Sequence, residues 1–111
     1  MTQSQFPKFD LVPYQVGLTA FCRKWKVRSI SLYGSAARED FSSLSDVDLL
    51  LAFFPEADPD LFDYVDMKAE LEQLFGRTVD LANRNSIEQS RNEMRKREIL
   101  GEAKVIYEEA A

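Results

Sequence analysis

The chain has 111 residues, 45% of them hydrophobic and 30% charged, and a net charge of −5; this is typical of one globular domain and lacks the basic surplus that broad nucleic-acid binding requires. It contains no histidine, which excludes serine–histidine and cysteine–histidine nucleophilic catalysis and a histidine-ligated zinc site within the chain. Its single cysteine, Cys22, cannot form an intrachain disulfide.

Residues 1–12 predict a loose lead-in, and a single domain is expected over residues 13–111. Pro13 can begin a helix, and apolar residues then recur at helical spacing at Leu18, Phe21, Cys22 and Trp25. A cysteine on such a stripe is expected to be buried rather than reactive. Residues 28–33 alternate in hydrophobicity, which predicts a strand that ends at Gly34.

The middle of the chain predicts a buried strand followed by a long helix. Residues 48–54 are almost continuously apolar, as in a central strand covered on both faces, and Pro55 ends this run. Asp58 and Pro59 predict a helix N-cap and a proline at the first helical position. A broad apolar stripe then continues to a stop at Gly76, and its members are Leu61, Val65, Met67, Leu71, Leu74 and Phe75.

Three shorter elements complete the predicted order. Residues 78–82 predict a strand, and Ser86 to Gln89 fits a capping box that begins a last helix reaching about residue 102. Residues 104–107 are compatible with a final strand. This alternation of helices and strands predicts an α/β fold, a small mixed sheet with helices packed on it. The sequence leaves the strand order open.

A glycine–serine pair and three aspartates stand beside the predicted strands. Gly34-Ser35 follows the first strand, Asp46 and Asp48 lead into the second, and Asp80 lies in the third. Side chains two apart on a strand leave the same face about 7 Å apart. Carboxylates next to an apolar strand would be costly to bury without a partner, so a bound metal would explain their placement.

Together these residues predict a magnesium-dependent site for a nucleoside triphosphate. Magnesium prefers oxygen ligands and is held by one or two carboxylates plus substrate phosphates. Asp80 could also accept the proton of an attacking hydroxyl. Each feature taken singly is more often an ordinary turn or a solvated cap. The residues expected to bind metal and to serve catalysis are Asp46, Asp48 and Asp80, and those expected to bind the nucleotide are Gly34, Ser35 and Arg38.

The order and spacing of this motif resemble the DNA polymerase beta-like nucleotidyltransferase superfamily, and more narrowly its minimal nucleotidyltransferases. Gly34-Ser35, ten intervening residues and Asp46-Val47-Asp48 form the two-part motif, with Asp80 as the later acidic residue. The ending over residues 102–108 is also similar, so the likeness extends over nearly the whole chain. The resemblance implies the polymerase beta-like fold, a triphosphate held by Gly34-Ser35, magnesium bound by Asp46 and Asp48, and Asp80 as the third catalytic carboxylate.

The resemblance also implies a partner protein. Minimal nucleotidyltransferases are commonly paired with a small all-helical HEPN toxin, a ribonuclease, and act as its antitoxin by transferring AMP from ATP to a tyrosine of the toxin. The chain has no evident acceptor-recognition domain, so the partner is expected to present the acceptor. No apolar stretch approaches the roughly 20 residues of a membrane span. A cytoplasmic protein without membrane contact or direct nucleic-acid binding is therefore expected.

Two other functions stay open at this point. Glu39 occupies a position where the family often has glycine, and it favours a binding module that neutralises its partner sterically with a vestigial site. A transferase acting on a small molecule, such as an aminoglycoside, is the second alternative. The basic residues of the last helix are expected to form a salt-bridged solvated face, or else to contact the partner or the nucleotide; they are Arg91, Arg95, Lys96 and Arg97.

Overall fold

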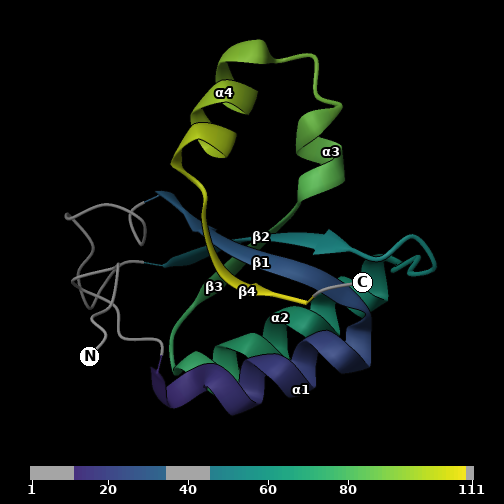
Figure 1. The fold of residues 1–111 in the computed structure, drawn as a ribbon, viewed down its shortest axis with the longest axis vertical. Coiled ribbons are helices and arrows are strands. Elements are labelled where there is room, and N and C mark those ends of the chain that lie inside the picture. The colour runs from purple at the N-terminus through teal and green to yellow at the C-terminus, as the bar shows by residue number, and fades with distance from the viewer. Residues whose placement is uncertain (1–11, 35–45, 110–111) are drawn as a thin grey trace.

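A four-stranded sheet with helices on both sides makes up the fold (Figure 1). The computed structural model describes residues 12–34 and 46–109. No helix within these two ranges is both long enough and apolar enough to cross a membrane. In chain order the elements are η1 (Val12–Tyr14), α1 (Gln15–Trp25), β1 (Val27–Tyr33), β2 (Val47–Phe53), α2 (Leu61–Phe75), β3 (Val79–Asn83), α3 (Arg84–Glu88), α4 (Glu93–Glu102) and β4 (Lys104–Glu108).

The sheet is mixed, as predicted, and its strand order is β3-β2-β1-β4. β1 pairs antiparallel with both β2 and β4, whereas β2 and β3 run parallel. A parallel pair needs a crossover connection, and α2 provides it between β2 and β3. β2, which carries Asp48, therefore lies inside the sheet with β3 at its outer side.

The main core lies between the sheet and the layer formed by α1 and α2. Val47, Leu49 and Leu51 project from one face of β2 and are fully buried there. Leu50 points to the opposite face and is only 1% exposed, on the side where α3 and α4 lie (Figure 1). The predicted central strand covered on both faces is therefore confirmed. Each such side chain contributes roughly 1.5–3 kcal/mol by leaving water.

Helix α1 carries the predicted apolar stripe into this core. Pro13 lies in the preceding 3-10 turn rather than in the helix itself, and Lys26 ends the helix in the left-handed conformation at φ 59°. Cys22 is 1% exposed, which confirms that it is a core residue. Burial, followed by the negative charge of Glu109, raises the pKa of the Cys22 thiol to about 12.

The start of α2 differs from the prediction. Asp60, not Asp58, is the N-cap: its side chain accepts from the Asp63 N–H at 2.8 Å, and the Asp63 side chain accepts from the Asp60 N–H at 3.0 Å. The reciprocal pair satisfies two backbone donors at once, so the helix begins after Pro59 rather than at it. Leu61 and Val65 are exposed at 76% and 61%, so the buried stripe is narrower than predicted.

The single last helix predicted from Ser86 onward is wrong, because two helices with separate caps occupy this segment. The Asn83 side chain accepts from the N–H groups of Asn85 and Ser86 and so begins α3. The Asn92 side chain accepts from the Arg95 N–H at 3.0 Å and begins α4. Asparagine is a strong N-cap, and the second one restarts the helix after a break. Ser86 lies inside α3 rather than at its cap.

Candidate active site

Asp48 and Asp80 lie side by side on adjacent parallel strands. The register pairs Asp48 of β2 with Asp80 of β3, and neighbouring strands lie about 4.8 Å apart. Paired residues of a ladder project from the same face of the sheet, so both carboxylates leave it together. Asp46 lies two residues before Asp48 and is exposed just ahead of β2. The parallel register is thus what brings Asp80, distant in sequence, to Asp48.

Gly34 directly follows β1 and lies against the Asp48 carboxylate. Its backbone has φ +67°, and a Cβ placed on it would lie 2.5 Å from Oδ2 of Asp48. A side chain at this position would therefore displace the carboxylate, and the left-handed backbone already favours glycine. Its predicted phosphate contact stays a prediction. Ser35, Arg38 and Glu39 lie outside the described residues.

Tyr33 adds a phenol to the same face of the sheet. It is the register partner of Asp48 on β1 and is half-buried. Burial, followed by the Asp48 charge, raises the pKa of Tyr33; Asp80 acts in the same direction, and Arg95 of α4 opposes them. Opposing charges from the sheet and from α4 therefore meet around Tyr33. Sequence reasoning missed this residue, although its place directly before Gly34 was a usable signal.

The donor set suits a hard cation that also takes ligands from a substrate. Within residues 12–34 and 46–109, no three acidic or cysteine side chains converge closely enough to hold a metal by themselves. Magnesium binds through as few as one or two carboxylates together with phosphates and waters. The adjacent Asp48 and Asp80 meet that lower requirement. The assignment of all three aspartates to the metal stays a prediction.

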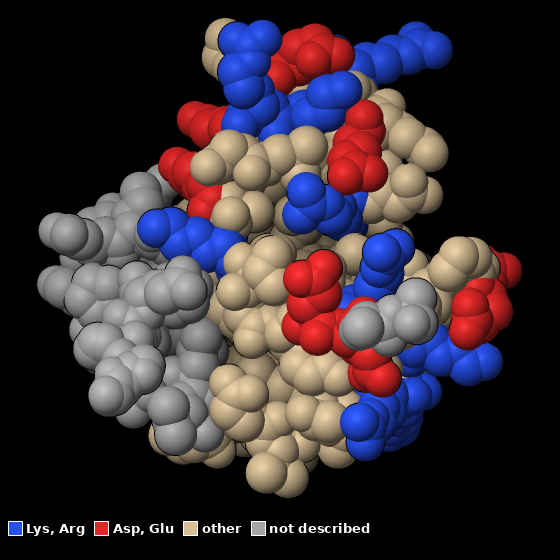
Figure 2. Space-filling model, viewed as in Figure 1, with Lys and Arg blue, Asp and Glu red and all other residues tan. Residues whose placement is uncertain are grey.

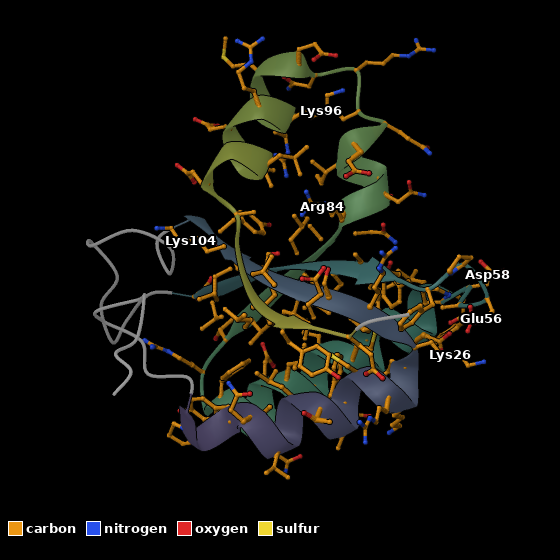
Figure 3. All side chains as sticks on the ribbon, in the orientation of Figure 1. Lys26, Glu56, Asp58, Arg84, Lys96 and Lys104 are labelled. Carbon is orange, nitrogen blue, oxygen red and sulfur yellow. The ribbon has the colours of Figure 1, made fainter. Side chains whose placement is uncertain are left out.

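Basic side chains gather at the tip formed by α3 and α4 (Figure 2). Lys96 pairs with Glu93 at 3.4 Å, and its Nζ donates to the Glu88 carbonyl at 3.1 Å, which links α4 to α3 (Figure 3). The predicted salt-bridged face is therefore present around Lys96. Arg91 and Arg97 are exposed and make no ion pair with other described residues.

A groove of about 700 Å³ lies at the other end of β2, away from the aspartates. Phe53, Arg84 and Asn85 contribute to its lining. Phe53 is five residues beyond Asp48, roughly 16 Å along an extended strand. Figure 3 shows the two ends: Lys104 marks the end where β1 finishes, and Asp58 marks the opposite end. The candidate active site and this groove are therefore separate.

The chain belongs to the nucleotidyltransferase domain family, whose model matches residues 17–106. A predicted protein adenylyltransferase of Methanocaldococcus jannaschii is 38% identical to it over 64 residues, which are 58% of this chain and 64% of that protein. The chain therefore spans somewhat less than two thirds of the length of this curated relative. Family membership and the sheet agree with the resemblance inferred from Gly34-Ser35 and the aspartates.

Solved structures share the fold. The solved structure of a protein assigned as a minimal nucleotidyltransferase matches with a TM-score of 0.62 at 27% identity, over 86% of this chain and 95% of that one. A toxin–antitoxin complex with AMP-PNP matches with a TM-score of 0.65 at 15% identity, over 86% and 73%. A structure of a tri-AMPylated HEPN toxin of Shewanella oneidensis in complex with MNT antitoxin matches with a TM-score of 0.57 at 14% identity, over 86% of this chain and 70% of that one. The polymerase beta-like nucleotidyltransferase architecture is thereby confirmed.

Proposed function

We propose that this chain transfers AMP from ATP to a tyrosine hydroxyl of a small helical HEPN-type toxin and thereby acts as its antitoxin in the cytoplasm. The observation that carries the proposal is the side-by-side placement of Asp48 and Asp80 with Gly34 against Asp48. The family supports nucleotidyl transfer. The similar complexes, one with AMP-PNP and one with an AMPylated toxin, support the nucleotide and the kind of partner.

The proposed reaction is an in-line displacement at the α-phosphorus of ATP. The tyrosine oxygen forms a bond to that phosphorus, the bond to the oxygen bridging the α- and β-phosphates breaks, and pyrophosphate leaves. Asp80 accepts the tyrosine proton. Magnesium, when bound, would neutralise charge on the phosphates, and Asp46, Asp48 and Asp80 are the residues that would hold it.

The nucleotide-binding part of the proposal rests on the turn after β1. Gly34 leaves room for close approach of a ligand to the backbone, and Ser35 and Arg38 follow it in sequence. A serine hydroxyl, backbone N–H groups and a guanidinium are suited to phosphate oxygens. Arg95 of α4, whose charge lowers the pKa of Tyr33, is a further cation available to the substrate.

The test is incubation of the chain with ATP, magnesium and the proposed HEPN-type partner. The intact mass of that protein is then measured, and the modified residue is located by fragmentation. We expect addition of AMP to a tyrosine, and a rate at least about a hundredfold lower in Asp48→Ala and Asp80→Ala because each removes a group acting on the reacting atoms.

Three other outcomes would each contradict the proposal. Tight binding of the unmodified partner, with suppression of its ribonuclease activity, would identify a binding module, the function that Glu39 favours. AMP found only on an added small molecule such as an aminoglycoside would identify the other class of acceptor. AMP transfer that survives in both aspartate variants would place the active site elsewhere.

A further inference from the structure

β3 is an edge strand. Val79, the residue before Asp80, is hydrogen-bonded by side chains on the edge of β3 that faces away from β2. The sheet order leaves β3 with β2 as its only neighbour among the described strands. The Thr78 carbonyl accepts from the Val47 N–H at 2.9 Å, so the backbone of Thr78 faces β2. Because strand polar groups alternate in direction, those of Val79 point outward. Such groups are normally left to water or to another strand.

Two side chains of α2 satisfy both outward groups of Val79. Oε2 of Glu72 accepts from the Val79 N–H at 3.0 Å, and Nζ of Lys68 donates to the Val79 carbonyl at 2.5 Å. Lys68 and Glu72 also bond to each other at 2.8 Å. The pair therefore takes the place of a neighbouring strand at this one residue, and it ties β3 to the helix beneath it.

Lys68 also has an electrostatic relation to the candidate carboxylates. Its hydrogen bond to Glu72 is the main cause that raises the pKa of Lys68, and the charges of Asp80 and Asp46 act in the same direction. Its ammonium is therefore within electrostatic reach of two carboxylates that would otherwise repel each other and the substrate phosphates.

We propose that Lys68 and Glu72 are positioning residues that fix Asp80 beside Asp48 by holding the backbone of Val79. This inference rests on the proposed function of the site. Asp80 follows Val79 directly, so a shift of Val79 along the strand edge moves the Asp80 carboxylate relative to its register partner. Groups that orient metal ligands in this way commonly change metal affinity or activity about 10- to 100-fold when removed.

Lys68→Met tests the inference, because methionine keeps the aliphatic stem and removes the donor. Lys68→Arg restores a donor and a charge. The matched control is Lys24→Met. Lys24 of α1 pairs with Glu70 of α2 at 2.6 Å, so its ion pair joins α1 to α2. Lys24 contacts neither β3 nor an aspartate of the site in any described bond. All three variants are compared with the wild type in AMP transfer to the partner and in Mn²⁺ binding in the presence of AMP-PNP.

We expect Lys68→Met to lower the rate at saturating ATP about tenfold and to raise the metal concentration needed for half-maximal rate by a similar factor. Lys68→Arg is expected to recover most of both losses, and Lys24→Met to behave as the wild type. A rate and a metal dependence unchanged in Lys68→Met would overturn the inference. So would equal losses in Lys68→Met and Lys24→Met, because they would indicate a general loss of stability.

Mn²⁺ binding separates this inference from the proposed function. If the wild type transfers no AMP, the proposed function fails, and the Mn²⁺ affinity of Lys68→Met relative to the wild type still decides the inference. About tenfold weaker binding supports positioning of Asp80. Unchanged binding, or a wild type that binds no Mn²⁺ with AMP-PNP, overturns it.

Discussion

At the scale of single residues, Gly34 joins backbone conformation directly to the candidate site. Gly34→Ala would place a Cβ 2.5 Å from Oδ2 of Asp48 on a backbone at φ +67°. We expect a loss of about 1 kcal/mol of stability from the left-handed conformation. We also expect at least about a tenfold loss of AMP transfer, because the carboxylate must move. Chemical denaturation and the partner assay measure the two effects.

Gly76→Ala is the matched control for this substitution. Gly76 has a similar φ of +70° but nothing within 4 Å of an added Cβ, so it incurs the backbone cost without touching an aspartate. We expect a similar loss of stability and an unchanged specific activity. Equal activity in the two alanine variants would show that contact between Gly34 and Asp48 has no role in the site.

The burial of the Cys22 thiol predicts how the stability of the fold changes at alkaline pH. Below about pH 9 the thiol is protonated in both the folded and the unfolded chain. Above it the unfolded thiol ionises, whereas burial raises the pKa of the native thiol from 9.0 to about 12. The unfolded state therefore loses protons first, and the free energy of unfolding falls as pH rises from about 9 toward 12.

Cys22→Ala isolates this effect from other groups. Tyr107 also has a pKa raised to about 12, mainly by its hydrogen bond to Glu109, and it gives a decline of the same sign. Urea denaturation at pH 7 and pH 10 is therefore compared in the two proteins. The loss of stability between these values should be smaller in Cys22→Ala, and an identical loss would show that the thiol is not protected by burial.

At the scale of elements, side-chain caps decide where the helices begin. The sequence predicted Asp58 as the N-cap of α2 because a proline follows it, and it predicted Ser86 as the start of one long last helix. The structure instead uses Asp60, Asn83 and Asn92. Several nearby residues of the same chemical type can each cap a helix, and the choice depends on how the chain leaves the sheet, which local patterns do not contain.

The two aspartates near the start of α2 separate the predicted cap from the observed one. Asp60→Ala removes the acceptor for the Asp63 N–H, and we expect it to cost about 1 kcal/mol of stability. Asp58→Ala should change stability by less than about 0.5 kcal/mol, as expected for a surface position. Thermal or urea unfolding of the two variants measures this difference. A larger loss of stability in Asp58→Ala than in Asp60→Ala would instead support Asp58, the N-cap predicted from the sequence.

At the scale of the whole molecule, the layers were predictable and the pairings were not. The continuous apolar run predicted β2 as a strand covered on both faces, and helical spacing placed Leu18 and Cys22 in the core. Both predictions were possible because buried positions are occupied by apolar residues at regular spacing. The parallel register of Asp48 and Asp80 arises from contacts between segments about 30 residues apart, which no local pattern records. The pairing of Tyr33 with Asp48 and the hydrogen bond from Lys68 to the Val79 carbonyl likewise join residues more than ten positions apart.

The most direct test of the central claim is which phosphate of ATP reaches the partner. The chain is incubated with magnesium, the proposed HEPN-type partner and ATP labelled with radioactive phosphorus at either the α or the γ position. AMP transfer predicts label on a partner tyrosine from α-labelled ATP alone, and loss of that label in Asp48→Ala. Label from the γ position, or none from the α position with a partner that binds tightly, would contradict the account.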